Sequence, residues 1–206
     1  MIQRATEQAQ FWAGEGGEAY IARNSSADLE ASNIVFFSKI LKSIPGSPRK
    51  VLELGANIGL NFRALAPLIP DLHYTGVEVN PVAFEELAKL ECVAIHSSIE
   101  DYQTTGDFDL VFSKGVLIHL NENSLFSTYQ KMYSASNRWI LVAEYYSPSP
   151  TSIPYRGRED LLFKRDFAGE MLDLFPDLAL HAYGFSYHRG PYPQDDINWF
   201  LMRKDS

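Results

Sequence analysis

Short apolar runs alternate with helical patterns of apolar and polar residues from Lys50 onwards. Helical spacing occurs at residues 61–68, 81–90 and 121–134. The runs between them are rich in β-branched and aromatic residues, which predicts strands at residues 51–54, 73–79, 92–96, 108–112 and 139–143. This alternation predicts an α/β fold in which a mostly parallel sheet carries helices on both faces.

The C-terminal part of the chain breaks this alternation. A helix is predicted at residues 165–175, and two strand patterns follow at 178–187 and 197–202 with no helix between them. Their connection contains Gly190, Pro191 and Pro193, so we expect the two strands to pair antiparallel.

The N-terminal part is aromatic and helical. Phe11, Trp12 and Tyr20 occur in a stretch rich in Gly and Glu, and a helix with apolar residues at positions 34, 37, 40 and 41 follows. Because this part is too short to form a domain, we interpret residues 1–48 as a helical lid. Residues 49–206 are the main domain of a single structural unit.

Composition and charge restrict the class of protein. The 206 residues are 46% hydrophobic and 21% charged, with a net charge of −8, which is typical of one globular domain without a cationic stripe for nucleic acid. The single Cys92 lies in an apolar run and predicts a buried, inert thiol. Residues 1–10 are polar and no apolar run is long enough to cross a membrane. We therefore expect a cytoplasmic protein.

Residues 51–59 carry the sharpest chemical signal. A strand containing Glu53 enters a turn with Gly55, Asn57 and Gly59, and a helix follows. Ligands bind beyond the carboxyl ends of strands in open parallel sheets. Gly55 permits a sharp turn and a close approach of ligand to backbone, and Asn57 tolerates positive φ. The alternative is a tight turn without a ligand.

Two cofactors compete for this loop. A dinucleotide requires glycines where Asn57 and Leu60 stand, so a nicotinamide-dependent oxidoreductase is disfavoured. S-adenosylmethionine carries no phosphate, and Glu53 suits its α-amino group, directly or through water. Glu78, at the end of the second strand, can accept both ribose hydroxyl hydrogens.

The ends of the third and fourth strands provide further candidates. Ser98 and Ile99 would contact adenine, although a polar turn explains them equally well. Ser113 and Lys114 would lie beneath the methionine end. His119 would lie near the reacting centre, although a lone His is more often structural.

These motifs together resemble the class I S-adenosylmethionine-dependent methyltransferases over residues 51–144. The resemblance implies a Rossmann-like seven-stranded sheet with an antiparallel last strand and an N-terminal helical lid. It also implies cofactor contacts at Glu53, Gly55, Glu78, Ser98 and Ile99, and we expect Tyr20 and Arg23 at the methionine end. The full set is Trp12, Tyr20, Arg23, Glu53, Gly55, Asn57, Gly59, Glu78, Val79, Ser98, Ile99, Ser113 and Lys114.

A narrower resemblance extends over nearly the whole chain. Residues 6–24, 154–170 and 187–196 are similar to the methylases associated with pseudaminic acid biosynthesis. This resemblance implies a small-molecule acceptor such as a sugar or nucleotide sugar. A methyltransferase of amino acids or peptides and a non-catalytic cofactor-binding module are the alternatives.

Acceptor contacts are expected in the long, proline-rich loop after the fifth strand. The candidates are Tyr146, Tyr155, Arg156, Arg158 and Lys164, whose cations would suit an anionic acceptor. Solvated arginines paired with Glu159 and Asp160 are the alternative. Candidate general bases are His119, Glu144, Tyr145 and His188. No spacing indicates a metal site.

Overall fold

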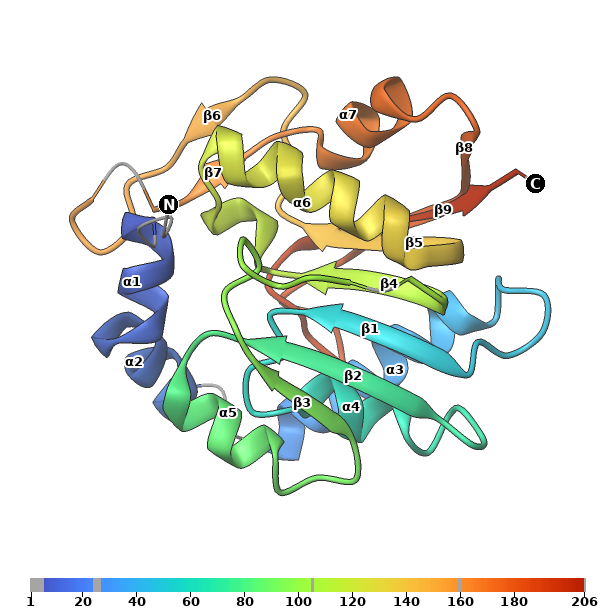
Figure 1. Ribbon diagram of the computed structural model, residues 1–206, viewed down its shortest axis with the longest axis horizontal. Coiled ribbons are helices and arrows are strands. Elements are labelled where there is room, and N and C mark those ends of the chain that lie inside the picture. Colours follow the sequence, from blue (N-terminus) through green and yellow to red (C-terminus); the bar gives the residue numbers. More distant parts are fainter. Residues whose placement is uncertain (1–5, 24–26, 105, 159–160, 206) are drawn as a thin grey trace.

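A seven-stranded sheet forms the centre of the molecule (Figure 1). The computed structural model describes residues 6–23, 27–104, 106–158 and 161–205. The strand order is β3-β2-β1-β4-β5-β9-β8, and β9 runs antiparallel to the other six strands. The strands are β1 (Lys50–Leu54), β2 (His73–Glu78), β3 (Val93–His96), β4 (Phe108–Lys114), β5 (Ser136–Glu144), β8 (Leu178–Ser186) and β9 (Ile197–Lys204). The expected mostly parallel sheet with an antiparallel last strand is confirmed.

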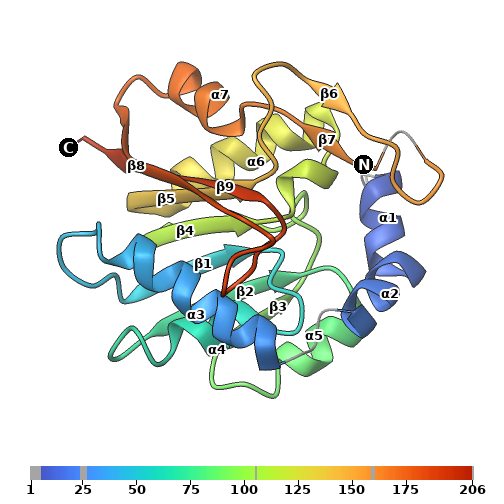
Figure 2. The ribbon, with the colours of Figure 1, turned by 180° about the vertical axis from the view of Figure 1, so that it is seen from behind.

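Helices cover both faces of the sheet (Figures 1 and 2). One face packs against α3 (Ala27–Leu41), α4 (Leu60–Leu65) and α5 (Pro81–Leu87), and the other against α6 (Glu122–Ala135) and α7 (Phe167–Leu174). Successive strand residues point to opposite faces, so Ile140 and Leu141 belong to different apolar clusters. Because both faces are covered at the centre of the sheet, the central strands β1, β4 and β5 are largely buried and mostly apolar.

The N-terminal helices lie beside the carboxyl edge of the sheet. They are α1 (Glu7–Ala13) and α2 (Glu15–Arg23), separated at Gly14. Asn80 Nδ2 donates to the Trp12 carbonyl at 3.1 Å, and Asn121 Nδ2 donates to Gln8 Oε1 at 3.1 Å. These bonds hold α1 against the loop after β2 and the start of α6.

The helix α3 departs from the predicted boundary between lid and main domain. Its Phe36, Phe37 and Ile40 are buried against the sheet. The apolar stripe of α3 thus completes the sheet's core, and the lid role proposed for residues 1–48 concerns α1 and α2.

Several element boundaries also differ from those predicted. The helix predicted at residues 81–90 begins at Pro81 with Asn80 as its N-cap, but it ends at Leu87. The loop after β5 contains a small antiparallel sheet of β6 (Thr151–Ser152) and β7 (Phe163–Lys164), which the sequence analysis missed because two-residue strands carry no periodicity. No helix in the described part of the chain is long and apolar enough to span a membrane.

The close packing of β2 predicts the effect of one substitution. A Cβ at Gly76 would lie 2.7 Å from Ala56 Cβ and 3.0 Å from Leu87 Cδ2. We expect Gly76→Ala to destabilise the fold by roughly 1–3 kcal/mol through overpacking, measured as a lower urea midpoint. Gly190→Ala is the control, since its nearest atom would be a carbonyl oxygen at 3.3 Å. Equal midpoints for the two variants would contradict this packing.

Candidate functional site

A cavity of about 300 Å³ opens at the carboxyl edge of the sheet. Its walls come from the loops after β1, β2, β3 and β4, from α1 and α2, and from the loop between β8 and β9. This is the edge at which the sequence predicted a ligand. No group of three or more His, Cys, Asp or Glu in the described residues is placed to hold a metal ion.

The turn after β1 approaches the cavity with its backbone. Gly55 has φ +84°, and a Cβ there would lie 2.5 Å from Val116 Cγ2. Asn57 has φ +47°. Both line the cavity, whereas Gly59 does not, because it precedes α4 and packs toward Leu90.

Glu78 is a buried carboxylate at the cavity wall. Its Oε2 accepts the Asn57 N–H at 2.7 Å and its Oε1 accepts the Asn80 N–H at 2.7 Å. Burial raises the pKa of Glu78, and these backbone donors oppose the shift. The Val79 N–H acts on this carboxylate in the same direction. The two oxygens together still have acceptor capacity for a ligand hydroxyl.

Glu53 lies behind the wall rather than on it. Its carboxylate accepts bonds from the Tyr74 hydroxyl and, at 2.5 Å, from Asn61 Nδ2. Burial raises the pKa of Glu53 to about 8. Asn61 lines the cavity in its place, so the structure gives no support to direct contact between Glu53 and a ligand.

A chain of buried amides extends from Asn61. Asn33 Nδ2 donates to Asn61 Oδ1 at 3.0 Å, and Gln194 Nε2 donates to Asn33 Oδ1 at 3.0 Å. All three side chains line the cavity. Sequence reasoning missed Asn33 and Gln194 because they are 161 positions apart and neither belongs to a local motif.

Lys114 projects from the end of β4 into the same wall. Its Nζ lies 5.6 Å from the centroid of the Phe36 ring, and no carboxylate of the described residues forms an ion pair with it. Burial lowers the pKa of Lys114, while Glu53 and Asp195 act in the opposite direction. With no ion-pair partner among the described residues, its Nζ is placed to bind an anionic group of a ligand.

Glu144 is a positioning group and does not line the cavity. Its Oε1 accepts the Ser113 hydroxyl at 3.1 Å and the backbone N–H groups of Val116 and Leu117 at 3.0 Å. Burial raises the pKa of Glu144 to about 7. Its carboxylate therefore organises the loop after β4, and the structure does not place it as a base. Ser113 is likewise turned away from the cavity.

His119 lines the cavity at the end of the short 3₁₀ helix Leu117–His119. Its Nδ1 lies 2.6 Å from the Leu161 carbonyl oxygen. Since a carbonyl can only accept, Nδ1 carries the hydrogen and Nε2 keeps a lone pair. Burial lowers the pKa of His119 to about 4, so the ring is neutral at neutral pH.

Aromatic residues surround His119. The ring centroid of Trp12 lies 4.4 Å from that of His119, 5.9 Å from that of Tyr20 and 6.4 Å from that of Tyr155. The Trp12 indole nitrogen is buried without a partner among the described residues. Trp12 and Tyr20 both line the cavity.

The remaining expected cofactor contacts are Val79, Ser98, Ile99 and Arg23. Val79, Ser98 and Ile99 line the cavity. Ser98 Oγ is engaged with Asp101, to whose carboxylate it donates at 2.9 Å. The side chain of Arg23 lies outside the described residues.

None of the five expected acceptor residues lines the cavity. Arg158 Nη2 lies 3.2 Å from Glu7 Oε2, and Arg156 lies over the Tyr155 ring at 5.6 Å. Lys164 lies over the Tyr145 ring at 5.3 Å, and Tyr146 is exposed. Both arginines thus contact residues outside the cavity, in or beside the proline-rich loop after β5, which we call the outer loop. Glu159 and Asp160, their expected partners, lie outside the described residues.

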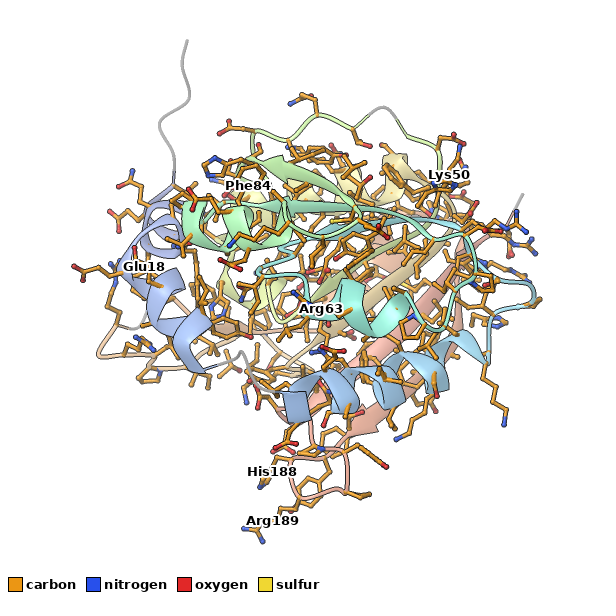
Figure 3. All side chains as sticks on the ribbon, turned by 90° about the horizontal axis from the view of Figure 1, so that it is seen from below. Glu18, Lys50, Arg63, Phe84, His188 and Arg189 are labelled. Atoms are coloured by element: carbon orange, nitrogen blue, oxygen red, sulfur yellow. The ribbon has the colours of Figure 1, made fainter. Side chains whose placement is uncertain are left out.

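The other two candidate bases are His188 and Tyr145. His188 lines the cavity, and its Nδ1 lies 2.8 Å from Asp196 Oδ2. Figure 3 shows His188 on the loop between β8 and β9, which Gln194 joins to α3. Tyr145 does not line the cavity, and burial strongly raises the pKa of its hydroxyl.

Comparisons with known proteins identify the fold. A family model described as a methyltransferase domain matches residues 51–137. No curated protein sequence matches the chain. A SAM-dependent methyltransferase from Leishmania major has a TM-score of 0.74 and 16% identity over 97% of this chain and 82% of its own. The magnesium protoporphyrin IX methyltransferase from Synechocystis, with bound S-adenosylhomocysteine (SAH), has a TM-score of 0.69 and 12% identity. The match covers 96% of this chain and 98% of the Synechocystis chain.

The plantazolicin methyltransferase in complex with SAH is also similar, with a TM-score of 0.66 and 15% identity over 97% of this chain and 94% of its own. At these identities the likeness establishes the fold. The chain has the Rossmann-like fold of SAM-dependent methyltransferases, as the sequence motifs implied.

The burial of Glu53 predicts a pH dependence of stability. Between its ordinary pKa of 4.5 and about 8, the folded state keeps the proton and the unfolded state loses it. Stability should therefore fall as pH rises through this window, by at most roughly 4–5 kcal/mol. Urea titrations should show a flatter pH profile for Glu53→Gln, whereas the exposed Glu85→Gln should keep the wild-type slope. A Glu53→Gln profile as steep as wild type would refute the prediction.

Proposed function

We propose that the chain is an S-adenosylmethionine-dependent methyltransferase that acts on a small-molecule acceptor. The observation that carries this proposal is the cavity beyond β1 and β2, where the Gly55 backbone and the Glu78 carboxylate face the same space. The matching family model and the fold support it. A pyrophosphate would lack two of its expected glycines in this loop, because Asn57 and Leu60 replace them.

The residues of the cavity suit the parts of this cofactor. Ile99 and Ser98 would receive the adenine, and the remaining acceptor capacity of Glu78 would bind the ribose hydroxyls. Lys114 and the remaining N–H of Asn61 would hold the carboxylate of the amino-acid end. The Arg23 contact with that carboxylate and the lid role of α1 and α2 remain part of the proposal.

The bound cofactor supplies a methyl group on a positively charged sulfur. The chain mainly has to align an acceptor atom with that group and exclude water. Alignment alone can supply most of the rate enhancement, because well-oriented reactants have large effective molarities. Trp12 and Tyr20 would cover the cavity. His119 Nε2, held as an acceptor by the Leu161 carbonyl, would bind the hydrogen of the attacking hydroxyl or amine and orient its lone pair.

The acceptor class is the finer part of the proposal. The resemblance of the flanking segments supports a sugar or nucleotide sugar, and His188, which lines the cavity and contacts Asp196, would face it. An anionic acceptor would contact Arg156 and Arg158 only if these side chains left Tyr155 and Glu7 and turned toward the cavity. The cytoplasm, where both cofactor and nucleotide sugars occur, is the proposed location.

Ligand-induced stabilisation tests the cofactor. SAH should raise the melting temperature, whereas NAD should not, because a ligand of the native state stabilises it by mass action. Labelled S-adenosylmethionine, incubated with nucleotide sugars, nonulosonic acids, amino acids and peptides in turn, should then label the first two classes. A shift with NAD alone would reject the methyltransferase proposal, and label in peptides alone would reject the sugar acceptor.

A truncated ligand tests which part of the cofactor Lys114 and Glu78 each bind. 5′-Methylthioadenosine keeps the ribose and lacks the amino-acid end. Lys114→Met should weaken SAH binding at least about tenfold and leave methylthioadenosine binding unchanged, because one charge-assisted hydrogen bond is lost. Glu78→Ala should weaken the binding of both ligands, because both carry the ribose. Calorimetric titrations in which Lys114→Met affects both equally would exclude the amino-acid end as its partner.

A further inference from the structure

The strand β8 is a long edge strand with little protection. It forms one end of the sheet, and within the described residues no strand pairs with its outer edge. It has nine residues, of which His181 is the only one that can carry a charge. Natural proteins usually shorten such edges or place Lys or Pro on them, because unpaired backbone groups there pair with another strand.

The opposite edge of the sheet provides a comparison. The strand β3 has four residues, and its His96 ring stacks on Phe84 of α5 at 4.9 Å. This edge is therefore short and partly covered. Figure 2 shows β8 along the near side of the molecule, with α7 above it and α3 below it. The two edges differ in exactly the features that protect a strand from pairing.

Exposed aromatic side chains follow the outer half of β8. Tyr183, Phe185 and Tyr187 are 70%, 54% and 48% exposed, and they alternate with smaller residues. The Tyr183 ring stacks near Phe200 of β9 at 6.5 Å, so these rings share one face of the sheet. Contiguous exposed apolar surface of this kind marks an interface.

We infer that β8 pairs antiparallel with β8 of a second copy of the chain, around a two-fold axis at Gly184. The β-bulge between Leu180 and Ala182 leaves residues 182–186 as the regular segment available for pairing. In this register Tyr183 lies opposite Phe185 of the partner subunit, and by symmetry Phe185 lies opposite Tyr183 of the partner subunit. Aromatic pairs across antiparallel strands are favourable, and two-fold pairing uses the same surface twice.

The available area is consistent with a dimer. At 150–250 Å² per fully buried ring, the three exposed rings would remove about 350 Å² per copy from water. A stable interface needs about 800 Å² per partner, so the rings supply nearly half. The backbone edge and the 45% exposed Leu180 add to this area. Gly184 allows close approach of the two strands, and Trp199 packs directly beneath it.

Sedimentation velocity over a series of protein concentrations tests this inference. Wild type should shift from the mass of one chain to that of two as concentration rises. Phe185→Lys and Tyr183→Lys should each raise the dissociation constant of the dimer at least about tenfold, because each places two lysines in the shared interface. Phe126→Lys is the matched control, since Phe126 is 48% exposed on α6.

Circular dichroism at low concentration should show that all three variants fold. Hydrogen exchange of wild type provides a second measurement, in which amides of residues 182–186 become more protected with concentration and those of β3 do not. Wild type that stays at the mass of one chain would overturn the inference. A dimer that survives both β8 substitutions, or that Phe126→Lys weakens equally, would also overturn it.

Discussion

Buried carboxylates at the carboxyl edge of the sheet are the constraint on which the site depends. Glu78 on β2 binds the N–H of Asn57 in the turn after β1, and Glu144 on β5 binds the N–H groups that open the 3₁₀ helix after β4. A buried carboxylate is costly unless donors satisfy it, so each one imposes a conformation on the loop of a neighbouring strand. The loops that form the cavity wall are therefore fixed by hydrogen bonds to these carboxylates.

The same requirement links segments that are distant along the chain. Glu53 receives a hydrogen bond from Asn61, which in turn is bound by Asn33, and Asn33 is bound by Gln194. This chain of amides joins β1 to the loop between β8 and β9. The end of the cavity proposed for the cofactor and the side proposed for the acceptor thus share one wall, which makes their geometries interdependent.

The positive charge expected to contact a ligand lies at the end of β4 and not in the proline-rich loop after β5. Arg158 is paired with Glu7 and Arg156 lies over an aromatic ring, so neither cation reaches the cavity. Lys114 is the cation that lines it. Because its surroundings are buried, an anion there gains more from the charge than it would at the surface. We therefore expect an acidic group of a ligand to bind more strongly at the end of β4 than in the proline-rich loop.

The sequence by itself determined the sheet, the start of α5, the turn at Gly55 and the tolerance of Asn57 for positive φ, because these depend on local periodicity and backbone sterics. It also located Glu78 at a strand end facing the cavity. Only the tertiary structure decided that Glu53 turns inward and that Asn33 meets Gln194. Those contacts join residues from different elements, so strand register and helix packing decide them, and no local pattern records either.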